Sequence, residues 1–333
     1  MRAGICAVLV LAACTTDGGG SATTSSSTSG GAVASSSSSS GGDEGGWVPR
    51  ADMANGPRQE TAVAALGGEI YVVGGFDEAN AVVADVEAYD PATDTWRTIA
   101  PLPEPLHHCN AAAVDGRLYV VGCLGGGNFG ATGITLEYDP AANMWTTRAP
   151  MPAGTERGSS AVGVVRSKVY VAGGLRGSSV TDFSSYDTAT NTWEILPPMP
   201  VPRDHLVGGA VGDTFYALGG RSPLTARVDA FSTSTGQWSE RASGPTARAG
   251  TAAAVLDGVI YVFGGEGNSA DPLGIFNDTE AYDPATDSWR VLRVMRTPRH
   301  GTGAAAVGSA IYVPGGATVQ GFGAVATMEM FVP

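Results

Sequence analysis

Tryptophan recurs along this chain at an almost constant interval, and this period limits the possible folds more than any other feature. Successive tryptophans are separated by 49, 49, 48, 45 and 51 residues. They are Trp47, Trp96, Trp145, Trp193, Trp238 and Trp289. A period of about 20 to 50 residues is typical of repeat proteins, in which each repeat forms one supersecondary unit. We therefore expect the chain from Trp47 onward to fold as an array of equivalent units.

Three further elements repeat in step with the tryptophans. A Tyr-x-x-Gly-Gly sequence recurs with the glycine pairs Gly74-Gly75, Gly173-Gly174, Gly219-Gly220, Gly264-Gly265 and Gly315-Gly316. In the second unit the pair is replaced by Gly122-Cys123. A second aromatic residue lies seven positions before a tryptophan at Tyr89, Tyr138, Tyr186, Phe231 and Tyr282. An arginine lies thirteen positions before the first tyrosine at Arg58, Arg157, Arg203, Arg248 and Arg299, and the second unit has Leu106 there.

This combination resembles the kelch repeat family over residues 47–333. The resemblance implies an all-β fold, a β-propeller in which each repeat is one four-stranded blade. The residues support this expectation independently, because the first unit holds four short apolar runs, at 61–66, 70–73, 86–89 and 96–99, separated by turn residues. No segment shows a sustained apolar period of 3.6 residues, so helices are not expected.

The two ends of the repeat pattern indicate how the ring closes. Trp47 has no aromatic residue seven positions before it, and Phe331 takes the place of that aromatic residue with no tryptophan after it. We therefore expect the strand Trp47–Met53 to complete the last blade. This gives a six-bladed ring without the open edges of an unclosed array.

The first residues resemble the leader of a bacterial lipoprotein. Arg2 precedes an apolar run that is too short for a transmembrane helix, and Leu11-Ala12-Ala13-Cys14 resembles a lipobox. The resemblance implies that residues 1–13 are a signal peptide and that Cys14 is lipidated. Residues 14–46, rich in Ser and Gly, are expected to be a disordered tether. The alternative is an ordinary signal peptide with a chance cysteine.

This leader predicts that the propeller is anchored to the bacterial cell envelope, and the propeller itself is expected to be monomeric. The outer membrane is the expected location, with the propeller in the periplasm or on the cell surface. Membrane contact is expected through the lipid anchor only. Such an anchor is firm when it carries several acyl chains, because each buried chain adds to membrane affinity.

Two cysteines lie outside the leader, and their spacing suggests a disulfide. Cys109 and Cys123 flank a hairpin whose turn is Asp115-Gly116. If Val114 faces Arg117, the two cysteines are opposite each other or one residue out of register. Disulfides persist in the oxidising compartment that an exported protein meets. The sequence leaves two alternatives open: buried free thiols, and a metal site shared with His107 and His108.

The binding face is expected where each blade begins its first strand and ends its second, at the mouth of the central channel. The candidate ligand-binding residues there are Arg58, Glu60, His107, His108, Arg157, Arg203, His205, Arg248, Arg299 and His300. A ring of guanidinium groups can hold carboxylate or phosphate, so an anionic protein or glycan is the predicted ligand. Eukaryotic kelch adaptors, which resemble this pattern, use such arginines to hold acidic peptide side chains. The alternative is that these arginines pair between blades.

The sequence favours non-catalytic binding over catalysis. It lacks G-x-S-x-G, H-E-x-x-H and a P-loop, and we expect no catalytic residue, cofactor or metal. The alternative is a carbohydrate-active enzyme resembling the periplasmic sialic acid epimerase, with acid–base work by His or Glu60. A copper radical oxidase is not favoured, because no tyrosine adjoins a histidine. The net charge of −13 argues against a protein that binds nucleic acid through phosphate neutralisation.

Overall fold

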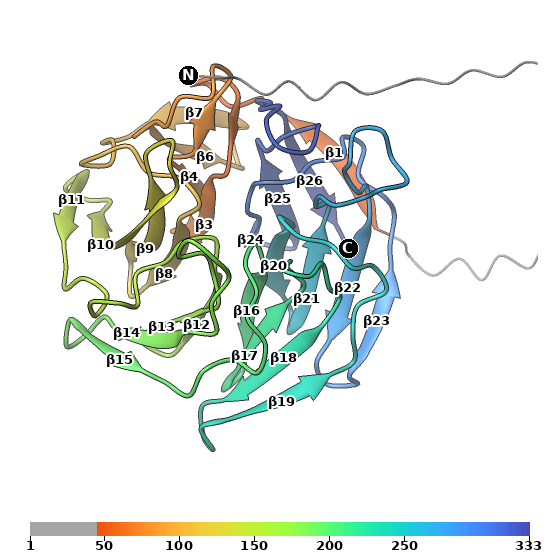
Figure 1. Cartoon of the computed structure of the whole chain (residues 1–333). Coiled ribbons are helices and arrows are strands. Elements are labelled where there is room, and N and C mark those ends of the chain that lie inside the picture. The colour runs from red at the N-terminus through yellow and green to blue at the C-terminus, as the bar shows by residue number, and fades with distance from the viewer. Residues whose placement is uncertain (1–44) are drawn as a thin grey trace, which may run out of the picture. The chain divides into compact units, whose positions relative to one another are not determined.

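The computed structural model describes residues 45–333, and all regular secondary structure in that range is β-strand (Figure 1). The expected signal peptide, the lipidation of Cys14 and nearly all of the tether lie outside the described residues. No helix in the described range is long and apolar enough to cross a membrane.

Six four-stranded antiparallel sheets form the blades of a propeller, as the repeat predicts. In chain order and from the first strand outward, they are β3 (Ala62–Leu66), β4 (Glu69–Val73), β6 (Val86–Asp90) and β7 (Thr95–Thr98); β8 (Asn110–Val114), β9 (Arg117–Gly125), β10 (Gly130–Asp139) and β11 (Met144–Thr147); β12 (Ala161–Val165), β13 (Lys168–Ala172), β14 (Phe183–Asp187) and β15 (Thr192–Ile195); β16 (Val207–Val211), β17 (Thr214–Leu218), β18 (Val228–Ser232) and β19 (Gln237–Arg241); β20 (Ala252–Leu256), β21 (Val259–Phe263), β22 (Thr279–Asp283) and β23 (Ser288–Val291); and β24 (Ala305–Val307), β25 (Ala310–Pro314), β26 (Met328–Val332) and β1 (Gly46–Arg50). A short pair, β2 (Arg58–Gln59) with β5 (Phe76–Asp77), lies outside the six sheets.

The sixth blade confirms the predicted closure of the ring. Strand β1 pairs antiparallel with β26, from Gly46 opposite Val332 to Arg50 opposite Met328, so the two ends of the propeller share one sheet (Figure 1). The strand is shorter than expected: it ends at Arg50, and the next N–H, that of Ala51, donates to the Asp94 side chain instead of a strand. The last blade is therefore completed by residues from the opposite end of the chain.

Each repeated tryptophan bonds the backbone just after the outer strand of a neighbouring blade. The indole N–H of Trp96 donates to Ala51 O at 2.7 Å, and that of Trp145 donates to Ala100 O at 2.8 Å. The remaining four tryptophans make the same type of bond at 2.8–3.0 Å. The period of the sequence thus marks a contact that recurs in every blade.

The glycine pairs end the second strand where adjacent blades meet. At Gly219 φ is +63° and at Gly220 it is +101°, a region that other residues rarely adopt. A Cβ on Gly219 would lie 2.9 Å from Arg248 O of the next blade. The Gly220 N–H donates to that same oxygen at 3.0 Å. Glycine is required here because the backbones of two blades bond directly.

The predicted disulfide between Cys109 and Cys123 is confirmed. Val114 does face Arg117 across the β8–β9 turn, so Asn110 faces Val121 and the two cysteines lie one residue out of register just beyond that pair. Neither cysteine is then a free thiol or a metal ligand. This bond explains why the second unit departs from the glycine pair.

Candidate functional site

The five repeated arginines are fully buried and do not line the channel mouth, which corrects the main expectation for the site. Arg58, Arg157, Arg203, Arg248 and Arg299 are between 0 and 2% exposed. Four of them form buried ion pairs, Arg58 with Glu87, Arg203 with Asp229, Arg248 with Glu280 and Arg299 with Glu329. The guanidinium of Arg157 donates to Ser184 Oγ at 2.9 Å. Burial lowers the pKa of Arg157, Arg203 and Arg299 to about 10.

These pairs lie within single blades, between an arginine four to six residues before the first strand and an acidic residue on the third strand. In the second blade both partners change together: Leu106 takes the place of the arginine and Leu136 that of the acid. Both leucines are buried in one hydrophobic cluster. The arginines therefore serve the structure of the blade, which was the alternative that the sequence left open, although the pairing is within blades rather than between them.

The residue two positions after each arginine, or after Leu106 in the second blade, lines the channel instead. The six residues of this channel ring are Glu60, His108, Ser159, His205, Gly250 and Gly301. Each has φ between +49° and +65°. Each donates its backbone N–H to the carbonyl of the preceding member, with Glu60 bonded to Gly301 and the other five bonds 2.8–3.0 Å long. A closed ring of six backbone hydrogen bonds thus fixes these positions around the channel.

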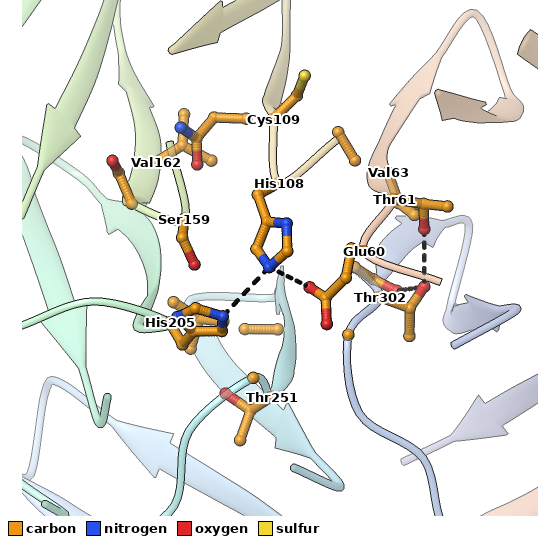
Figure 2. A pocket seen from close by; sticks show the side chains of 18 of the residues that line it. Glu60, Thr61, Val63, His108, Cys109, Ser159, Val162, His205, Thr251 and Thr302 are labelled. Carbon is orange, nitrogen blue, oxygen red and sulfur yellow. Dashed lines mark hydrogen bonds and ion pairs between the residues drawn. The ribbon is translucent and has the colours of Figure 1, made fainter. Parts of the chain in front are cut away.

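Three side chains of the channel ring meet at one point (Figure 2). His108 Nε2 lies 3.0 Å from Glu60 Oε2 and 3.2 Å from His205 Nε2. The two imidazoles are 4–5% exposed and the Glu60 side chain is 12% exposed. Glycine at the neighbouring ring position makes room for the carboxylate, since a Cβ on Gly301 would lie 2.5 Å from Glu60 Oε1.

A second set of charged groups surrounds these three side chains. His205 Nδ1 bonds Asp204 Oδ1 at 2.5 Å. Arg221 donates to Asp204 at 3.0 Å, to Glu266 at 2.5 Å and to His205 Nε2 at 3.0 Å. His300 Nδ1 lies 3.8 Å from Glu60 and 3.7 Å from Glu266. The mouth therefore holds three carboxylates around one guanidinium.

Burial dominates the electrostatics of this cluster. It raises the pKa of Glu60, lowers that of His107 to about 4 and lowers that of His108 well below its usual value. Burial also acts to raise the pKa of Asp204, but hydrogen bonds from His205 and Ser179 and the charge of Arg221 outweigh it and lower the value to about 2. Burial thus disfavours the charged forms of Glu60, His107 and His108.

Three aromatic rings line a pocket beside the cluster, which we call the outer pocket. Phe76 packs against Phe322 at 5.3 Å and against Phe129 at 5.9 Å between ring centres. These rings and the charged groups line a cavity of about 110 Å³, which has space for several waters. Glu60, His108 and His205 also line a second cavity of about 120 Å³ that continues along the channel past Thr61, Ser160 and Thr302. They therefore lie where the outer pocket meets the channel.

The structure brings together only part of the predicted set. Glu60, His107, His108, His205 and His300 lie at the mouth, with all four histidines of the chain among them. Arg221 and Glu266 face this cluster as well, and each directly follows a glycine pair. Arg221 pairs with Asp204 through an isolated β-bridge, and Glu266 pairs with Ala249 in the same way. Sequence reasoning missed Phe76, Phe129 and Phe322. Phe76 could have been found, because it occupies the same place after its glycine pair as Arg221 and Glu266 do.

Fold and site together define a closed six-bladed propeller with a polar cluster at the mouth of its channel. The model of the KLHDC2/KLHL20/DRC7 Kelch-repeats domain matches residues 48–220 and 158–316. The Kelch-like protein terF of Aspergillus terreus is 37% identical over 297 residues, which cover 83% of this chain and 65% of that protein. This chain belongs to the kelch-repeat family.

More distant relatives share the same region. Kelch-like protein 25 of Xenopus tropicalis is 30% identical over 74% of this chain and 42% of its own length. Kelch-like protein 23 of Homo sapiens is 28% identical over 74% of this chain and 43% of its own length. This chain thus spans under two thirds of the fungal relative and less than half of these animal ones. The solved structure of YjhT, at 18% identity, matches with a TM-score of 0.68 over 84% of this chain and 96% of that chain, a likeness of fold.

Proposed function

We propose that the propeller is a non-catalytic binding module that takes a glycan into the outer pocket of the channel mouth. The observation that carries this proposal is that carboxylate, imidazole and guanidinium groups line one pocket together with three phenylalanines. Polar groups of this kind bond sugar hydroxyls, and aromatic rings pack against the C–H face of a sugar ring. A peptide ligand is the other class that such a pocket accommodates.

The charge of the pocket changes the expected ligand. The sequence predicts an anionic ligand because of five arginines, but these arginines are buried within the blades. Asp204 and Glu266 form ion pairs with Arg221, and Glu60 lies in the same pocket lining. We therefore propose a neutral glycan.

The half-exposed ring of Phe322 provides the test. We expect Phe322→Ala to weaken the binding of a glycan found by array screening about 10-fold, because an aromatic contact contributes about 0.5–1.5 kcal/mol beyond its buried area. Affinity is measured by calorimetry with the purified sugar. The control is Ile195→Ala, which removes an exposed apolar side chain from the outer strand β15. Binding only to peptides, or equal affinity in Phe322→Ala, contradicts a glycan pocket.

Acid–base catalysis on a sugar is the second candidate, favoured by one contact. The carboxyl group of Glu60, whose pKa burial raises, lies 3.0 Å from His108 Nε2, and such a pair can transfer a proton. This candidate, an enzyme resembling the periplasmic sialic acid epimerase, predicts that the protein speeds anomer or epimer interconversion of an acidic sugar. Proton NMR should show the exchange, and Glu60→Gln should abolish it. Spectra unchanged by the wild-type protein across a panel of sugars exclude this activity.

We also propose that the propeller is anchored to the bacterial envelope through Cys14. The support is the sequence Leu11-Ala12-Ala13-Cys14 after an apolar run. In a bacterial host, the chain should label with fatty acid and fractionate with membranes, and Cys14→Ser should do neither. Cys6→Ser, the other cysteine of the leader, is the matched control and should behave as wild type. Wild-type protein that takes up no fatty acid contradicts the anchor.

A further inference from the structure

Three side chains from three blades present metal-ligating atoms to one point at the channel mouth. One oxygen of Glu60 and one nitrogen each of His108 and His205 all lie within 4.8 Å of one another. We propose that these residues bind one divalent transition-metal ion of the class that includes Zn²⁺ and Fe²⁺. The inference goes beyond the proposed glycan and does not depend on it.

The two distances from His108 to the other ligands are close to those of a coordination sphere. Zinc–nitrogen and zinc–oxygen bonds of about 2.0–2.2 Å place neighbouring ligand atoms of a tetrahedral ion roughly 3.3 Å apart. The contacts of His108 Nε2 are 3.0 Å to Glu60 Oε2 and 3.2 Å to His205 Nε2. Two histidines and one carboxylate are also the ligand set of many catalytic zinc and non-haem iron sites.

The hydrogen bonds of His205 direct a lone pair to this point. Its Nδ1 lies 2.5 Å from Asp204 Oδ1, so the Nδ1–H donates to this side chain oxygen. With the proton on Nδ1, the Nε2 atom presents its lone pair, which already accepts from Arg221. A histidine whose second nitrogen donates to a carboxylate is the usual arrangement around protein-bound metals.

The same reasoning applies to His108 through its neighbour. His107 Nε2 lies 3.0 Å from Gly126 O, a carbonyl that only accepts, so His107 carries its proton on Nε2. Its Nδ1 therefore accepts, and His108 Nδ1, 2.5 Å away, is the donor. The Nε2 atom of His108 is left with a lone pair that faces the lone pair of His205 at 3.2 Å. Positive charge between them would turn this unfavourable contact into a favourable one.

A further buried nitrogen, on His300, also presents a lone pair that a positive charge would stabilise. His300 is 1% exposed, and its Nε2 lies 2.9 Å from Val319 O, so Nε2 donates and Nδ1 carries a lone pair. Within the described residues Nδ1 has no hydrogen-bond partner. It faces the carboxylates of Glu60 and Glu266.

Among the described residues, Arg221 is the one cationic side chain that contacts a proposed ligand atom, and it would compete with a metal ion there. Its Nη2 lies 3.0 Å from His205 Nε2, and the side chain is 39% exposed, so solvent borders it on one side. Three carboxylates against one guanidinium favour a divalent cation. Three protein ligands also leave a coordination position of a tetrahedral ion for water or for a group of a ligand.

The test uses the full, tag-free chain after treatment with a chelator. We expect it to bind one equivalent of Co²⁺, with visible absorption bands that added Zn²⁺ abolishes. The variants His108→Gly and His205→Gly should lower the Co²⁺ affinity at least about 100-fold, since even residues outside the coordination sphere are worth about 10- to 100-fold. Glycine suits these positions of positive φ, and the chain itself uses it at Gly250 and Gly301.

The matched control is Ser159→Gly, which removes a side chain from the ring position between the two histidines and should keep wild-type affinity. Glu60→Gln, which keeps the shape of the side chain, tests the third ligand should a glycine variant fail to fold. Saturable binding lost in the ligand variants and kept in Ser159→Gly supports the site. Absence of saturable Co²⁺ binding by the wild-type chain, or equal binding by His205→Gly or Glu60→Gln, overturns it, whatever sugar the propeller binds.

Discussion

A chain that lacks residues 46–53 should lose its single cooperative thermal transition. These residues supply β1, which pairs with β26 along its whole length and is the only strand of the last blade that comes from the start of the propeller. Without β1, the edge of β26 is open and the first and last parts of the chain no longer share a sheet. Calorimetry should then show a broad transition at lower temperature, and size-exclusion chromatography should show association through the free edge.

A single substitution on the same strand should destabilise the protein without removing the strand. Trp47→Ala should lower the free energy of unfolding by about 3–5 kcal/mol, the usual cost of truncating a large buried aromatic side chain. The indole is 7% exposed, packs 5.4 Å from Phe263 and 5.1 Å from Phe331, and donates to Arg293 O. Val48→Ala, on the exposed side of β1, is the control and should change stability by less than about 0.5 kcal/mol. A sharp transition at the wild-type temperature in the deletion variant would disprove closure by β1.

The sequence predicted the fold because its period recurs in every blade. The tryptophans, glycine pairs and arginines each mark a contact that all or nearly all blades need, so their spacing alone gives the number of blades. The disulfide was predictable for the same reason, because Cys123 stands where the pattern requires glycine.

The candidate site could be predicted only in part, because a site differs from the repeat. Arg203 and Arg299 recur because they belong to the scaffold, so their regular spacing does not mark a binding ring. The informative position is two residues further on, where the chain reads Glu60, His108, Ser159, His205 and then two glycines. Which of these side chains meet depends on the channel radius, and no spacing along the sequence gives it. Phe129 and Phe322 lie in loops that no repeat constrains.

The second large effect that we expect is a loss of stability when a buried arginine is replaced. Arg248→Leu should lower the free energy of unfolding by about 3–5 kcal/mol, because removing one partner leaves a buried charge without compensation. Arg248 bonds Glu280 at 2.8 Å, and it also donates to Gly264 O at 2.8 Å and Asp278 O at 3.0 Å. In the variant, the Glu280 carboxylate keeps only the hydroxyl of Thr246, at 2.7 Å.

The double variant Arg248→Leu/Glu280→Leu should recover half or more of that loss. The second blade already carries leucine at both positions, Leu106 and Leu136, and replacing a buried ion pair with packed apolar side chains is often neutral or stabilising. Recovery should stay incomplete, because Gly264 O loses its donor. In the second blade, Asn110 supplies that donor and bonds Gly122 O at 3.1 Å.

Urea denaturation monitored by tryptophan fluorescence measures both variants, with the slope m checked for a shared two-state transition. The matched control is Arg166→Leu, whose partner Asp213 is on the surface and whose side chain is 80% exposed; such pairs are worth about 0–1 kcal/mol. A scaffold role requires Arg248→Leu to be far less stable than Arg166→Leu and the double variant to be more stable than Arg248→Leu. If Arg248→Leu keeps wild-type stability, or the double variant is the least stable of all, the buried arginines do not hold the blades in the way that their contacts indicate.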